Sequence, residues 1–250
     1  MKIRNLVMVL TLASVSISCS DASKKESKYA DLTKQYAKVQ LTSDISHLSD
    51  KEKEMLGYLF EVGEIMDDIF WTQNYGGDKE TFLNSIKDPN ARLFAEINYG
   101  PWNHFDNLTP FLPKHDPMPA GAGFYPADMT KEEFEAWDNP DKTSQYTLIR
   151  RDENGQLQAV WYHEAYAHQI NHAASLMLKA ANLAGDYEFA RYLRLRAKAL
   201  LTDNYFDSDM AWMDVRNNNV DFVVGPIENY VDALYGYKAA HEAFILIKDQ

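Results

Sequence analysis

Apolar residues recur at intervals of three and four in the first third of this 250-residue chain and predict a long helix. Met55 and Leu59 follow that spacing, which places them on one helical face. Ser49 and Glu52 precede the run with the spacing of a capping box, so the helix is expected over residues 50–73. Shorter helices are predicted over residues 79–86, 89–97 and 130–137.

The pattern changes to that of paired strands after residue 145. Two short runs, Tyr146–Arg151 and Gln156–Trp161, flank an Asn-Gly turn signal, which is typical of a β-hairpin near residues 146–161. Helices are expected again over residues 163–183 and 187–201, because apolar positions return to helical spacing there. The short Gly-Asp link between them implies an antiparallel helical pair.

Three further stretches complete the expected fold. Six prolines between Gly100 and Pro126 exclude regular helix, and the aromatic residues among them indicate an ordered loop. Trp212 and Met213 are expected in a connection. An apolar run that stops at a Gly-Pro turn signal predicts an extended segment near residues 220–232. The elements together indicate an α+β fold that is mainly α-helical.

Three polar side chains alternate along that extended segment. Glu228, Tyr230 and Asp232 stand two residues apart, so in a strand all three would point to one face. A line of carboxylate, phenol and carboxylate is a plausible wall for a peptide-binding groove. The same spacing also fits an edge strand with a solvated polar face, and spacing alone leaves both interpretations open.

Composition and charge narrow the range of functions. The chain is 46% hydrophobic, which is enough to build a buried core. Its net charge of -12 argues against a nucleic-acid partner, because such binding relies on Lys and Arg to neutralise phosphates. The single cysteine, Cys19, excludes an internal disulfide.

Several motifs resemble one family of metallopeptidases. The residues that carry the resemblance extend from about Leu48 to the end of the chain and occur in the family's order: Asn98–Trp102, Phe124–Phe134, Ser208–Asp214, Gly225–Asp232 and Glu242–Phe244. They are similar to the dipeptidyl peptidase III family, and most of all to its bacterial branch, which is related to the peptidase-like domain fused to Nudix hydrolases in plants. The resemblance implies that the chain is part of a two-lobed metallopeptidase fold.

The resemblance also implies an activity and a partner. Members of this family are zinc peptidases that remove dipeptides from the N-termini of short peptides. By the matching motif, Glu228 would hold the free ammonium group of the peptide, and Tyr230 would donate a hydrogen bond to the carbonyl that becomes an oxyanion. Asp232 would orient the segment. Short peptides with a free N-terminus are therefore the expected partners.

Zinc is expected in a complete family member, but no metal ligand is assigned in this chain. The string from His163 to His168 lacks the glycine of the family's zinc signature and precedes the Glu228 segment instead of following it. The sequence ends straight after what the resemblance gives as a family helix. We therefore expect residues 29–250 to be the N-terminal portion of such a domain, without its zinc-binding half and inactive alone. The alternative is a peptide-binding lipoprotein that does not cleave.

A separate metal hypothesis rests on helical spacing. Glu164, His168 and His172 stand four residues apart, so one continuous helix would place them on a single face. A carboxylate with two imidazoles suits zinc. The alternative is a solvated polar stripe on an amphipathic helix, and it requires no ligand.

The first residues carry the pattern of an export signal. A basic start and a short apolar core within residues 1–18 lead to Cys19, as in a bacterial lipoprotein. Residues 19–28 would then be the lipidated cysteine and a polar tether. We expect an exported lipoprotein of the cell envelope, periplasmic or anchored to the outer membrane, that contacts the membrane only through this lipid.

Overall fold

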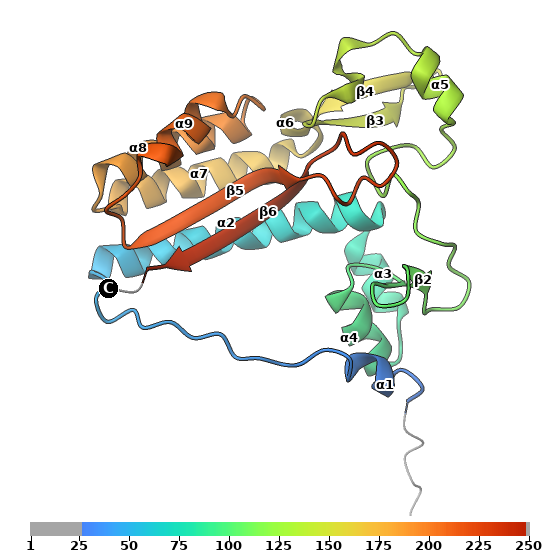
Figure 1. Cartoon of the computed structure of the whole chain (residues 1–250), viewed down its shortest axis with the longest axis horizontal. Coiled ribbons are helices and arrows are strands. Elements are labelled where there is room, and N and C mark those ends of the chain that lie inside the picture. The colour runs from blue at the N-terminus through green and yellow to red at the C-terminus, as the bar shows by residue number, and fades with distance from the viewer. Residues whose placement is uncertain (1–26, 249–250) are drawn as a thin grey trace, which may run out of the picture.

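One long helix, α2 (Asp50–Tyr75), crosses the molecule and organises the core (Figure 1). The computed structural model describes residues 27–248 of the chain. The predicted capping box is present, since the side chain of Ser49 accepts from the N–H of Glu52 and the Glu52 carboxylate accepts from the N–H of Ser49. Met55 and Leu59 are buried, as expected. The helix ends at Gly76, whose φ of 78° suits a residue without a side chain.

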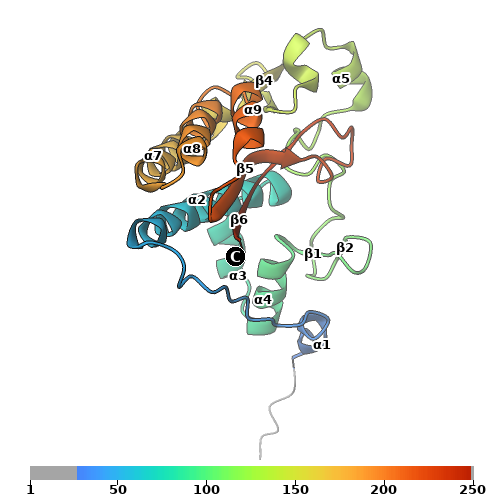
Figure 2. The same cartoon turned by 60° about the vertical axis from the view of Figure 1, so that its left-hand side comes forward.

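One helix and a two-stranded ribbon pack directly on α2, and two further helices extend this packing. Helix α7 (Ala167–Leu183) packs on α2, α8 (Tyr187–Leu200) on α7, and α9 (Phe206–Asp214) on α8. Figures 1 and 2 show the antiparallel strands β5 (Val220–Glu228) and β6 (Ala240–Ile247) running along α2 beside these helices. Phe222 and Val224 of β5 are buried in the core between them.

The remaining elements lie toward the end of α2 that carries Tyr75. The hairpin strands pair from Thr147–Trp161 to Arg151–Leu157, where the sequence pattern predicted a β-hairpin. The bounds of these elements are α1 Ala30–Thr33, α3 Lys79–Ser85, α4 Pro89–Ile97, β1 Trp102–Asn103, β2 Thr109–Pro110, α5 Lys131–Ala136, a 3-10 helix Pro140–Thr143, β3 Thr147–Arg151, β4 Leu157–Trp161 and α6 Tyr162–Ala165.

The proline-rich loop is ordered and is fastened to the end of α2. The N–H of Gly123 donates to the carbonyl of Gln73 at 2.7 Å. A Cβ atom at Gly123 would lie 2.4 Å from the carbonyl oxygen of Thr72, so only glycine permits this approach. Arg150 of β3 donates to the carbonyls of Gly123 and Phe124, which joins the loop to the hairpin.

Four expectations are wrong in detail. The helix predicted over 163–183 is interrupted at Tyr166, whose buried ring and φ of −115° separate α6 from α7. Trp212 and Met213 belong to helix α9 and not to a connection. The segment after residue 239 is strand β6, with alternating burial, where the resemblance gave a helix. The extended segment ends at Glu228, because the chain turns at Asn229–Gly236.

The predicted signal, Cys19 and nearly all of the tether lie outside the described residues. The first described contacts are those of Ser27, whose hydroxyl donates to Asp88 at 2.6 Å, and of Tyr29, whose ring packs edge-on against Phe111. Within residues 27–248, no helix combines the length and apolar character that crossing a membrane requires.

Candidate functional site

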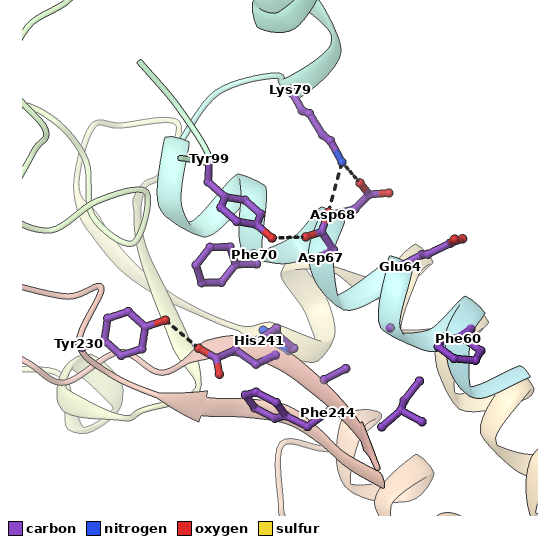
Figure 3. A pocket seen from close by; sticks show the side chains of 14 residues that line it. Phe60, Glu64, Asp67, Asp68, Phe70, Lys79, Tyr99, Tyr230, His241 and Phe244 are labelled. Atoms are coloured by element: carbon purple, nitrogen blue, oxygen red, sulfur yellow. Dashed lines mark hydrogen bonds and ion pairs between the residues drawn. The ribbon is translucent and has the colours of Figure 1, made fainter. Parts of the chain in front are cut away.

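A pocket of about 900 Å³ lies between α2 and β6 (Figure 3). Residues from α2 form one wall and consecutive residues of β6 form the other, and Lys79, Tyr99 and Tyr230 also line the pocket. Most of the side chains that line the pocket are aromatic or charged. They are Phe60, Glu64, Asp67, Asp68, Phe70, Lys79, Tyr99, Tyr230, His241, Glu242, Ala243, Phe244 and Ile245, together with Gly63.

The β6 wall carries a phenol bonded to a carboxylate. The hydroxyl of Tyr230 donates to Oε1 of Glu242 at 3.1 Å (Figure 3). Partial burial, and then the nearby charges of Glu242 and Glu228, raise the pKa of Tyr230 to about 12. Burial also raises the pKa of the Glu242 carboxyl, and the charge of Glu228 acts in the same direction. The phenol is therefore protonated at neutral pH and can act as a hydrogen-bond donor.

On the α2 wall, a second phenol donates a hydrogen bond to a carboxylate. Tyr99 donates to Oδ1 of Asp67 at 2.6 Å, and Lys79 lies 2.6 Å from Asp68 and 3.5 Å from Asp67. Tyr99 has a φ of 52°, which is uncommon for a bulky residue. The side chain of Asn74 donates to the Tyr99 carbonyl at 2.9 Å and holds this turn in place.

Gln73 and His241 join the two walls below the pocket. The N–H of His241 donates to Oε1 of Gln73 at 2.8 Å, and Nε2 of Gln73 lies 3.0 Å from Nδ1 of His241. Since the amide oxygen is already assigned as the acceptor, the amide nitrogen is the donor and Nδ1 accepts. Complete burial lowers the pKa of His241 to about 3, so the imidazole is neutral.

Asp232 lies inside the loop that follows β5 and not on the pocket wall. Its carboxylate is buried and accepts five hydrogen bonds, one of them from the Tyr125 hydroxyl at 2.7 Å. The other four come from the backbone N–H groups of Leu234, Tyr235, Tyr237 and Lys238 at 2.9 to 3.2 Å. Asp232 thus fixes the shape of the loop that carries Tyr230.

The structure therefore separates the three residues that the alternation grouped. Tyr230 lines the pocket, Asp232 is buried, and Glu228 is exposed and outside the pocket lining. They do not share one face, because the strand ends at Glu228 and the chain turns. Tyr99 and Glu242 received no role from the sequence, although both lie in motifs that carried the family resemblance.

The separate zinc hypothesis finds no support in the geometry. Glu164 belongs to α6, while His168 and His172 follow the interruption at Tyr166, and all three side chains are exposed. In the part of the chain that the structure describes, no three His, Cys, Asp or Glu side chains form a group that would hold a metal. His163 instead bonds through Nδ1 to the buried carboxylate of Asp203 at 2.7 Å.

Comparison with known proteins finds similar proteins by structure and by sequence. The structure of DPP III from Caldithrix abyssi is 38% identical in sequence to this chain. The match covers 86% of this chain and 43% of that protein, with a TM-score of 0.82. Dipeptidyl-peptidase III from Corallococcus sp. strain EGB is 33% identical over 88% of this chain and 43% of its own, with a TM-score of 0.83. Nudix hydrolase 3 from Arabidopsis thaliana is 28% identical over 288 residues, which are 90% of this chain and 37% of the plant protein. No family model matches the sequence. The chain thus spans less than half the length of these relatives.

Proposed function

Since this chain is related to the dipeptidyl peptidase III family in sequence and fold, we propose that it forms the peptide-binding part of an exported peptidase of that type. The observation that carries the proposal is the pocket between α2 and β6, where a protonated phenol and carboxylates meet in a chain with this fold. Its ligands would be short peptides with a free N-terminus. Removal of dipeptides would be the reaction of the complete protein.

The motif roles receive unequal support from the geometry. Tyr230 faces the pocket with a hydroxyl suited to donate to a peptide carbonyl, and this supports its proposed role. Asp232 is well placed to orient the segment through its five hydrogen bonds. Glu228 is exposed just outside the pocket lining, so its proposed contact with the peptide ammonium is at the rim.

Zinc, which the resemblance implies for a complete family member, does not fit the residues described here. Glu164, His168 and His172 do not converge, and no other three ligands come together within residues 27–248. We therefore derive no catalytic step through a metal from this chain. If a zinc-binding half exists, its ligands come from elsewhere, and the described residues contribute substrate binding.

Calorimetry with Ala-Ala-Ala-amide and its N-acetyl derivative tests the proposed binding. The free peptide is expected to bind the purified chain, and acetylation to weaken it by about tenfold or more, because the charge-assisted bonds of the ammonium are lost. Product analysis after incubation with zinc separates cleavage from capture. Equal affinity for both peptides, or no binding of either, would contradict the proposal.

Export and lipidation form a second, independent part of the proposal. The support is the pattern of residues 1–19, and the tether would end where Ser27 contacts Asp88. Mass spectrometry of the mature N-terminus should find an acylated Cys19, and Cys19→Ser should move the protein from the membrane fraction to the soluble fraction. An unprocessed N-terminus, or a variant that stays with the membrane, would contradict it.

A further inference from the structure

Helix α9 presents its large apolar residues to solvent. Phe206, Met210 and Met213 stand at positions i, i+4 and i+7, so they form one row along the helix surface. They are 70%, 49% and 61% exposed, whereas the residues that α9 buries are the small Ser208 and Ala211. A helix of a globular protein normally turns its large apolar residues toward the core. A row of three on the outer face therefore indicates a surface that another molecule covers.

The neighbouring helix α8 supplies cations to the same side of the molecule. Arg191 lies 3.3 Å from Asp214 at one end of α9. Lys198 and Asp207 line a common hollow of about 250 Å³ at the other end. Figures 1 and 2 show the two helices side by side. We define the α8–α9 face by its exposed residues Arg191, Lys198, Phe206, Asp207, Met210 and Met213.

The charge of this region differs from that of the rest of the chain. Residues 187–214 contain four Lys or Arg and five Asp or Glu, so they are nearly neutral in a chain of net charge -12. All four cations belong to α8, while α9 contains three aspartates and no cation. Acidic surfaces of two copies repel each other. Two copies can therefore approach most readily where the charge is balanced, as it is across α8 and α9.

A two-fold rotation would bring opposite charges of two copies together. If the axis runs along the helices and between them, α8 of one copy faces α9 of the other, and positions along the helices are kept. Lys198 would then meet Asp207 of the partner subunit, and Arg191 would meet Asp214 of the partner subunit. The apolar row of α9 would pack against the aliphatic stems of the facing cations. The α8–α9 face is thus complementary to itself.

A lipid surface fits this face less well than a second copy does. Helices that lie in a membrane interface typically carry Lys or Arg beside their apolar residues, whereas α9 carries aspartates. Figure 1 also places α1 and α9 at opposite ends of the molecule, so the proposed lipid tether, which leads to α1, would hold α9 away from the membrane.

We propose that the α8–α9 face is a contact surface for a second copy of this chain, which forms a two-fold symmetric dimer. The 14 residues of α8 span about 21 Å, and two adjacent helices are about 20 Å wide. Such a face is smaller than the roughly 800 Å² per partner of a standard stable interface, so the dimer is weak and reversible. It is independent of peptide binding, because no residue of α8 or α9 lines the pocket between α2 and β6.

Sedimentation velocity of the purified chain over about 1 to 500 μM tests the dimer. Every sample carries Cys19→Ser, which removes the proposed lipid attachment and the one thiol that could link two copies. Met210→Glu places a charge in the apolar row. Leu93→Glu is the matched control, since Leu93 is 47% exposed on a helix outside this face and Met210 is 49% exposed. Circular dichroism verifies that each variant is folded.

Met210→Glu should raise the dissociation constant of the dimer by about tenfold or more, and Leu93→Glu should leave it unchanged. Lys198→Glu should also weaken the dimer, and adding Asp207→Lys should restore it to within about threefold, because the facing charges are again opposite. A monomer at every concentration would overturn the proposal, as would equal effects of Met210→Glu and Leu93→Glu. Binding to phosphatidylcholine vesicles that depends on Met210, without a dimer, would overturn it in favour of a lipid surface.

Discussion

Tyr230 and Asp232 stand two residues apart in one loop, yet their surroundings are opposite. Tyr230 is 67% exposed and makes one hydrogen bond across the pocket wall, whereas Asp232 is 2% exposed and accepts five. The loop can present an exposed phenol at a fixed position because a buried carboxylate organises its backbone. One short motif thus contains a group suited to binding and a group that supports the structure.

The same division applies to the whole site. The supporting frame consists of buried groups that hydrogen bonds hold in place, among them Gln73, His241 and Lys238. The pocket groups Tyr230 and Glu242 are partly exposed and have few partners. Substitutions in the frame should therefore change stability, and substitutions in the pocket should change binding with little effect on stability.

The largest effect is expected for Asp232→Asn. The asparagine amide would direct an NH₂ group at backbone N–H donors that now point to a carboxylate. The substitution would also remove the negative charge of Asp232 that acts on the nearby Lys238 ammonium. We expect the free energy of unfolding to fall by about 3 to 5 kcal/mol. Urea unfolding followed by circular dichroism measures this change, and a loss below about 1 kcal/mol would show that Asp232 is not the centre of the loop.

Gly123→Ala should have the next largest effect, because the added methyl group meets the end of α2. Its carbon would lie 2.4 Å from the Thr72 carbonyl oxygen and 2.8 Å from Cα of Gly76. Backbone atoms cannot move aside as a flexible side chain does, so a loss of about 1 to 3 kcal/mol is expected. Gly155→Ala is a contrasting variant, since open space surrounds that position and only its φ of 78° opposes a side chain. Equal losses in both variants would contradict the predicted close contact.

Lys238 gives the frame a pH dependence. Its ammonium is fully buried against the carbonyls of Lys142 and Ser144, and burial lowers its pKa to about 7. Between that pH and the ordinary lysine pKa of about 10.4, the unfolded chain binds more protons than the folded chain. Lys238 should therefore make stability rise with pH over this interval, by at most about 1.4 kcal/mol per pH unit.

The measurement is a series of urea unfolding curves from pH 6 to about 10.4, the upper end of that interval, for the wild type and Lys238→Met. The free energy of unfolding of the wild type minus that of Lys238→Met should rise with pH over this interval, because both proteins contain all the other titrating groups. Lys238→Met is expected to be less stable where the lysine is neutral, since the neutral amine can still donate to two of the three oxygen atoms around it. Parallel curves across the whole series would show that Lys238 keeps an ordinary pKa.

The sequence predicted the helical frame better than the site. The capping box of Ser49 and the spacing of Met55 and Leu59 are local signals, and they locate α2 closely. The interruption at Tyr166 is not local, because the ring is buried among residues distant in sequence, such as His241. Strand β6 was misread as a helix, although Ile245 and Ile247 alternate with exposed neighbours.

The candidate site could be predicted only in part, for a physical reason. Alternation at period two assigns a common face only while the chain stays extended, and β5 ends at Glu228. The partner that turns Asp232 inward, Tyr125, is 107 residues away. Glu242 and Asp67 meet the pocket through packing of β6 on α2, which no short motif encodes. Family resemblance pointed to the right segment but not to its geometry.

The smallest effect on stability is expected for Tyr230→Phe, which is also the sharpest test of the division between frame and pocket. The ring is 67% exposed and its hydroxyl bonds only to Glu242 within the described chain. Removing that oxygen should change the free energy of unfolding by less than about 0.5 kcal/mol. Binding of Ala-Ala-Ala-amide should weaken by about tenfold, because a donor to the peptide carbonyl is lost.

Tyr237→Phe is the matched control for this variant, since Tyr237 lies in the same loop, stacks on Tyr235 and does not line the pocket. It should leave peptide affinity unchanged. An effect of Tyr230→Phe on stability as large as that of Asp232→Asn would place Tyr230 in the frame.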